Sequence, residues 1–139
     1  MKSTIKKVVS VTLIFMLALI CCTGVLAEGV EPRWKELSTM SCSLTRTNGL
    51  FNNASLSSHA SSWNNDNTIS LTVTIQKWNG SSYINTSYSW TDSGKGMASV
   101  NKNVNLASGN YIAHAVATVY NSSGSYVETV TLDSSEIII

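Results

Sequence analysis

Few side chains in this 139-residue sequence could carry out acid–base or nucleophilic chemistry. His59 and His114 are its only histidines. Serine is so abundant that a Ser-His-Asp combination can be drawn in many ways, and such a combination has no diagnostic value. The sequence contains no G-x-S-x-G, H-E-x-x-H, C-x-x-C or glycine-rich phosphate loop. We therefore predict that the protein is not an enzyme.

Metal and thiol chemistry have equally little support. Residues 63–67, W-N-N-D-N, gather oxygen-bearing side chains of the kind that bind calcium, but the twelve-residue pattern of an EF-hand is missing. We expect a solvated turn there, with a calcium loop as the alternative. Cys42 alternates with Met40 and Leu44, which favours a buried small side chain over a reactive or intermolecular thiol. We expect neither a metal nor a cofactor.

Residues 1–27 are typical of an export signal that is removed from the mature protein. Three lysines lie near the start, residues 8–22 are almost wholly apolar, and V-L-A at 25–27 fits a signal-peptidase site. We expect cleavage before Glu28, secretion to the extracellular space, and no stable membrane anchor after cleavage. The alternative is an uncleaved membrane anchor, for which the apolar stretch is short.

Residues 28–139 have the size of a single domain. Three of the nine basic residues lie in the signal, so six bases accompany eight acids in this part, and they form no basic stripe. Binding to a phosphate backbone needs such a stripe, so we expect no nucleic-acid partner. Ser, Thr and Asn supply 45 of these 112 residues, a composition typical of the solvated faces and turns of antiparallel sheets.

Apolar and polar residues alternate with a period of two, which indicates β-strands. The clearest case is residues 69–76, followed by an Asn79-Gly80 turn and a returning strand over 83–90. A second turn is expected over 92–96, and Lys102 interrupts the apolar face of the strand that follows. The pattern predicts an all-β fold, an antiparallel β-sandwich of about seven strands. We expect these strands near residues 36–45, 54–63, 69–76, 83–90, 100–106, 111–120 and 126–132, with 137–139 extending the last one or pairing along an edge.

His114 lies in the middle of one expected strand. If Tyr111 faces the core, the small residues at 113, 115, 117 and 119 face it too. His114 then shares the opposite face with Ile112, Val116 and Tyr120. We therefore expect a partly covered surface histidine rather than a ligand or a catalytic base. This face is more apolar than a free surface needs to be, so we expect a partner there.

Aromatic residues flank two hairpins of similar sequence. Trp78 and Tyr83 enclose one Asn-led turn, and Tyr120 and Tyr126 enclose another. Exposed aromatic side chains beside polar ones can stack on sugar rings or anchor protein contacts. The alternative is a structural role, in which each pair closes its own hairpin.

Residues 106–111, L-A-S-G-N-Y, resemble the corner between strands E and F of immunoglobulin-like and fibronectin type III sandwiches. The resemblance implies that Leu106 ends strand E, Gly109 turns, and Tyr111 opens strand F with its hydroxyl bonded back to the corner. The disulfide of antibody-type domains is absent, because Cys42 has no partner. With V-T-I-Q-K-W at 73–78, the chain also resembles small, uncharacterised secreted proteins of Gram-positive bacteria, which carry no catalytic residues to transfer.

We therefore expect a secreted, non-catalytic protein that acts by surface recognition of an unknown protein or glycan. One alternative is a carbohydrate- or cell-wall-binding module that uses exposed aromatic residues. A second is a secreted antimicrobial or toxin-like factor. The expected binding surface consists of Trp78, Tyr83, Ile112, His114, Val116, Tyr120 and Tyr126.

Overall fold

The computed structural model describes residues 34–139, so the expected signal peptide, 1–27, and its cleavage site lie outside the described residues. The described part consists of strands joined by turns and contains no helix that could cross a membrane. The strands are β1 (Leu37–Arg46), β2 (Ala54–Ser62), β3 (Thr68–Trp78), β4 (Tyr83–Lys95), β5 (Met97–Val104), β6 (Asn110–Tyr120), β7 (Tyr126–Asp133) and β8 (Ile137–Ile138).

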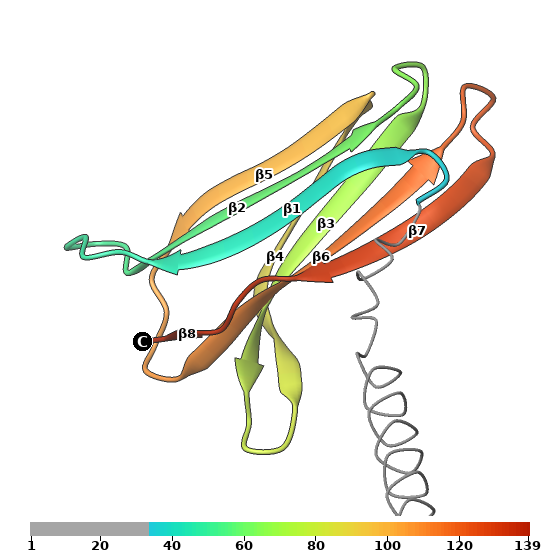
Figure 1. The fold of residues 1–139 in the computed structure, drawn as a ribbon. Coiled ribbons are helices and arrows are strands. Elements are labelled where there is room, and N and C mark those ends of the chain that lie inside the picture. Colours follow the sequence, from blue (N-terminus) through green and yellow to red (C-terminus); the bar gives the residue numbers. More distant parts are fainter. Residues whose placement is uncertain (1–33) are drawn as a thin grey trace, which may run out of the picture. The chain divides into compact units, whose positions relative to one another are not determined.

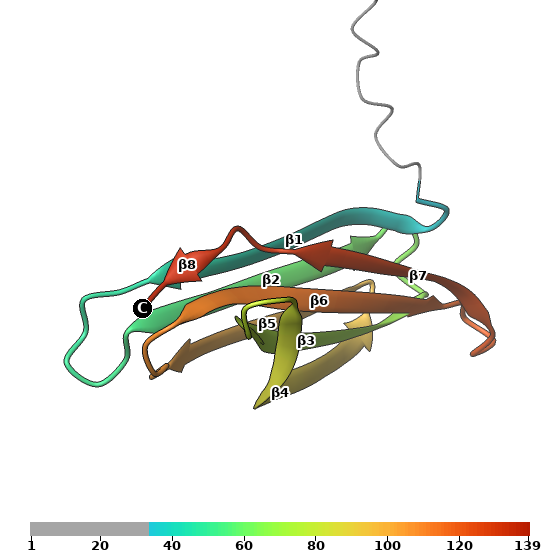
Figure 2. The same cartoon turned by 90° about the horizontal axis from the view of Figure 1, so that it is seen from below.

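The strands form two antiparallel sheets (Figures 1 and 2). One sheet has the order β1-β2-β5, and the other has the order β4-β3-β6-β7, with the short β8 beside β6. Their facing sides enclose one apolar core to which both sheets contribute. The prediction of an all-β antiparallel fold is confirmed, and the arrangement is sandwich-like.

The alternation predicted for β3 and β6 is confirmed by burial. Ile69, Leu71, Val73 and Ile75 are fully buried, and so are the small residues at 113, 115, 117 and 119. The small side chains of β6 let the other sheet come close. At this approach, the Sγ of Cys42 on β1 donates to the carbonyl oxygen of residue 113 at 3.5 Å.

The turn predicted over 92–96 is wrong. β4 continues to Lys95, and the chain turns only at Gly96, whose φ of 71° suits glycine. Polar residues extend the strand because they keep pairing with β3: the Oγ of Ser93, for example, donates to the carbonyl of Ile69 at 3.0 Å. After Gly96 the chain passes into the other sheet as β5, so β4 and β5 lie at the same open side of the fold.

The corner between β5 and β6 contains the hydrogen bond that the resemblance implied. The hydroxyl of Tyr111 donates to the carbonyl oxygen of Ala107 at 3.0 Å. Gly109 has a φ of 150°, and its backbone exchanges two hydrogen bonds with that of Ile139. Residues 137–138 therefore pair along the edge at β6 as a separate strand instead of extending β7.

A carboxylate fastens the first strand of one sheet to the last long strand of the other. Glu128 of β7 accepts hydrogen bonds from the backbone N–H groups of Lys35, Glu36 and Leu37, at 3.0, 2.7 and 2.8 Å. We call this arrangement the Glu128 clamp. Desolvation by burial raises the pKa of this carboxyl, but the three N–H donors and the charge of Lys35 outweigh it, and the pKa lies below its ordinary value.

Candidate functional site

All seven residues of the expected binding surface lie on one face, the outward side of the five-stranded sheet, which we call the outer face. Strand register places them there, since each pairs across the sheet with other outward residues, and the sequence neighbours of Ile112, His114 and Val116 face the core. From β4 to β7 the rows of outward side chains are Ser93, Ser70, Thr118 and Thr129; Thr91, Thr72, Val116 and Thr131; Ser89, Thr74, His114 and Asp133; and Asn85, Gln76 and Ile112.

The middle of the outer face consists mainly of polar side chains that are hydrogen-bonded to one another. Side-chain pairs bridge neighbouring strands at Thr72–Thr91 (2.8 Å), Thr74–Ser89 (2.8 Å), Gln76–Asn85 (2.8 Å) and Thr118–Thr129 (3.0 Å). These pairs use part of the donor capacity of the face internally and fix the side chains. The outer face is therefore an ordered surface rather than a set of free polar side chains.

An aromatic pair stands at each end of the outer face. Trp78 and Tyr83 are register partners whose ring centroids lie 5.2 Å apart, and Tyr120 is the register partner of Tyr126. Trp78 is 40% exposed and Tyr126 is 63% exposed. At about 3.3 Å per residue, the ten residue-to-residue steps along β3 separate the two pairs by about 33 Å.

Both hairpins are closed as their similar sequences indicated. The side-chain oxygen of Asn79 accepts two backbone N–H bonds at 2.9 Å, and that of Asn121 does the same at 3.0 and 2.9 Å. Gly80 and Gly124 take positive φ values. The aromatic pairs therefore lie beside well-formed hairpin turns, and the exposed parts of Trp78 and Tyr126 are also accessible to a binding partner.

Tyr83 has a further partner. Its hydroxyl donates to the carboxylate of Glu136 beyond β7. This hydrogen bond raises the pKa of Tyr83, with smaller contributions from desolvation and from the charge of Glu136. The hydroxyl end of the ring is therefore held in place at this end of the outer face.

His114 is a surface residue, as expected, with its side chain 32% exposed. Its Nδ1 lies 2.5 Å from a carboxylate oxygen of Asp133 on β7. Thr74 is its register partner on β3, but within residues 34–139 no hydroxyl is hydrogen-bonded to the imidazole. Asp133 orients the ring and leaves Nε2 for an external partner. The row formed by Ser89, Thr74, His114 and Asp133 therefore lacks the hydroxyl–imidazole hydrogen bond of a Ser-His-Asp triad.

Two apolar members of the expected surface are less available than the sequence indicated. Ile112 lies on the expected face but is only 8% exposed. Val116 is half-buried between Thr72 and Thr131. Ile112 therefore offers little surface to a partner, and the aromatic ends include the more exposed side chains Trp78 and Tyr126.

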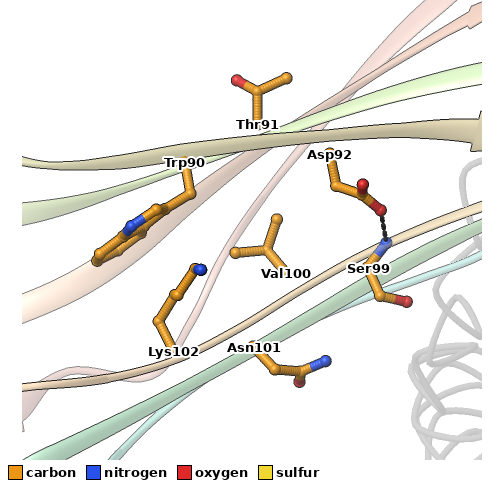
Figure 3. Close-up of a pocket in the computed structure, with 7 residues that line it drawn as sticks. All are labelled: Trp90, Thr91, Asp92, Ser99, Val100, Asn101 and Lys102. Atoms are coloured by element: carbon orange, nitrogen blue, oxygen red, sulfur yellow. Dashed lines mark hydrogen bonds between the residues drawn. The ribbon is translucent and has the colours of Figure 1, made fainter.

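A second candidate site lies between β4 and β5, at the open side of the fold. Here a pocket of about 380 Å³ is lined by Trp90, Thr91, Asp92, Ser99, Val100, Asn101 and Lys102. Figure 3 shows Trp90 and Asp92 on one strand and Val100 and Lys102 on the other, with the Asp92 carboxylate accepting the Ser99 N–H at 2.9 Å. The sequence indicated the strands and the break at Lys102 but not this pocket, because β4 and β5 belong to different sheets.

Strand periodicity in the sequence did not point to two further exposed apolar residues. Leu50 and Phe51, in the loop between β1 and β2, are 97% and 85% exposed, and the loop projects beyond the strands in Figure 1. The signal that could have revealed them is two large apolar residues inside an Asn/Gly turn, N-G-L-F-N-N, where no strand alternation accounts for them.

Burial affects both the thiol and one residue of the oxygen-rich turn. Cys42 is partly buried, and burial, with the nearby charge of Asp133, raises the pKa of its thiol to about 11 despite hydrogen bonds with Ser58 and Ser134. In the turn at 63–67, Asn67 is buried and donates to Glu36 and Ser62 at 3.0 Å. Across residues 34–139, no group of three or more His, Cys, Asp or Glu side chains is placed to hold a metal ion.

Comparison of the chain with protein-family models, with curated proteins and with solved structures finds no match in any of the three.

Proposed function

We propose that this protein is a secreted, non-catalytic β-sandwich of immunoglobulin/fibronectin III-like type that recognises a partner with its outer face. Export rests on the signal pattern of residues 1–27. Mass spectrometry of protein recovered from culture medium is expected to find Glu28 at the amino terminus. Material that begins at Met1 would contradict cleavage.

Strand order and the β5–β6 corner support the immunoglobulin-like part of the proposal. β1, β2 and β5 share one sheet as strands A, B and E do, and β3, β6 and β7 share the other as C, F and G do. β4 lies beside β3 in the position of an added C′ strand. The Tyr111–Ala107 hydrogen bond has the form of a tyrosine corner.

One observation carries the recognition part: the register gathers four aromatic residues and the His114–Asp133 pair on one face. Tyrosine and tryptophan are enriched among residues that dominate binding energy at protein interfaces. The polar side chains between them are hydrogen-bonded to one another, so a partner need not supply hydrogen bonds to these groups. An ordered sheet face whose aromatic ends lie about 33 Å apart favours a protein partner over a small molecule, because its length exceeds that of a single small-ligand site.

Site-specific crosslinking tests this proposal. A photoreactive side chain at Thr131, on the outer face, is compared with one at Ser57, on the outward side of the other sheet. Incubation with the surface of the producing cells is expected to give a discrete adduct from position 131 only. Trp78→Ser combined with Tyr126→Ser is expected to weaken that binding about thirtyfold, since two aromatic residues at the ends of the face, at about 1 kcal/mol each, contribute about 2 kcal/mol together. Equal crosslinking from both positions, or none from either, would refute recognition by the outer face.

A further inference from the structure

We propose that the β4–β5 pocket binds an acidic sugar, with Trp90 as the stacking platform and Lys102 as the partner of the sugar carboxylate. This site shares Thr91 with the outer face but none of the seven residues of the expected binding surface, and it lies at the open side of the fold, where the edge strands β4 and β5 of the two sheets face each other.

A hydrogen bond between the two sheets lies at each end of the pocket. At one end the hydroxyl of Tyr88 donates to the carbonyl of Asn105 at 3.1 Å, and at the other the Asp92 carboxylate accepts the N–H of Ser99 at 2.9 Å. Four residues of strand, about 13 Å, separate these ends. Its volume of about 380 Å³ falls at the lower end of the range for small-ligand sites, about 300–1,000 Å³.

Trp90 provides a fixed aromatic surface inside this frame. Its ring stacks on Tyr88, with centroids 6.0 Å apart and planes inclined by 27°. It is partly buried against the core, so its position is set by packing. A sugar ring presents apolar C–H groups on one side and hydroxyls around its edge, which matches an indole beside the polar groups of Asp92 and Lys102.

Lys102 gives the site its charge preference. It continues the inward-facing row of β5 that contains the buried residues Ala98, Val100 and Val104, but its own side chain is exposed at the open side of the fold. Within residues 34–139 it makes neither an ion pair nor a cation–π contact. An exposed ammonium without an ion-pair partner is free to bind an anion that enters the pocket. The ammonium reaches into the pocket from the strand opposite Trp90 (Figure 3).

The two groups make separate demands on a ligand. The indole selects a ring with an apolar side, and the ammonium selects an anion at the rim of that ring, which together describe a sugar carrying a carboxylate. The Asp92 carboxylate is engaged by Ser99 and retains acceptor capacity for a sugar hydroxyl.

Titration with two matched probes tests the proposal. Methyl β-glucuronide and methyl β-glucoside differ only in a carboxylate in place of a hydroxymethyl group. Amide and indole NMR shifts of the labelled protein are followed for each. The glucuronide is expected to shift Ser99 and the Trp90 indole and to bind about tenfold more tightly than the glucoside, because it adds a charge-assisted contact.

Variants separate the two roles and provide controls. Lys102→Met keeps the apolar stem and is expected to make the two affinities equal, whereas Trp90→Leu is expected to weaken both probes about tenfold or more. Lys95→Met, which removes an exposed charge outside the pocket, and Trp78→Ala, on the outer face, are expected to change neither affinity. Absence of shifts with 50 mM glucuronide (about the weakest affinity of interest), equal binding of the two probes, or shifts confined to the outer face would overturn the proposal. None of these outcomes bears on the crosslinking test of the outer face.

Discussion

Replacement of Glu128 by glutamine tests the clamp that joins β1 to β7. The glutamate accepts from Glu36 and Leu37 with one oxygen and from Lys35 with the other. Glutamine keeps one carbonyl oxygen for the first two N–H groups, but its amide then presents a donor to the N–H of Lys35. One hydrogen bond is lost and two lose their charge assistance. Because the clamp is only partly buried, we take low values for each change and expect a loss of about 2 kcal/mol in the free energy of unfolding.

The pH dependence of this loss distinguishes the clamp from simple packing. The pKa of Glu128 is lower in the folded protein than its ordinary value of 4.5, so its contribution is complete above that value. The contribution disappears as the pH falls through the folded pKa. The difference between the original protein and Glu128→Gln is therefore expected to be constant at pH 6–8 (roughly the plateau above both values) and to shrink on acidification below 4.5.

Urea unfolding at a series of pH values measures this difference, and hydrogen exchange locates it. Amides of Lys35, Glu36 and Leu37 are expected to lose protection in the variant, and thermal unfolding near neutral pH should occur roughly 10 °C lower. Asp66→Asn is the matched control, since Asp66 is exposed and its carboxylate makes none of the hydrogen bonds of the clamp. A stability difference that stays the same down to acid pH, or unchanged exchange at the three amides, would refute the assignment of the energy to the carboxylate.

Three further predictions concern other features. Tyr111→Phe leaves the carbonyl of Ala107 without its donor and is expected to cost about 1–2 kcal/mol in urea unfolding; an unchanged midpoint would show that the corner bond contributes nothing. Cys42 is expected to react with a thiol reagent at pH 8 about a hundredfold more slowly in the folded protein than in urea, because its pKa of about 11 leaves little thiolate; rapid labelling of the folded protein would contradict this. Leu50→Ser with Phe51→Ser is expected to change stability by no more than about 0.5 kcal/mol, since both side chains are exposed, and a larger loss in thermal unfolding would mean that the loop packs on the domain.

Local patterns in the sequence predicted much of the fold. The alternation at Ile69–Leu71–Val73–Ile75 and the parity set by Tyr111 both agree with the observed burial, because one buried face imposes a period of two on a strand. The same parity placed His114 correctly on the outer face. The end of β4 was not predictable in this way, since polar residues such as Ser93 are held by pairing with β3 rather than by burial.

The features that sequence reasoning missed depend on residues that are distant in the chain. Nothing around Glu128 indicates that its carboxylate meets the N–H groups of Lys35 to Leu37, about ninety positions away. The pocket between Trp90 and Lys102 likewise exists only because the chain changes sheets at Gly96. Periodicity reports which face of a strand is buried, but it does not report which strand edges come together in space.

The Glu128 clamp also bears on when the domain can finish folding. A chain is synthesised from its amino terminus onward, so the Lys35 end of β1 is made long before Glu128. Hydrogen bonds between residues separated by 91 to 93 positions cannot form until nearly the whole chain is available. Closure of so long a loop is slow compared with the formation of the local hairpins. The clamp can therefore form only after β7 has been synthesised, and β1 gains these three hydrogen bonds at a late stage of folding.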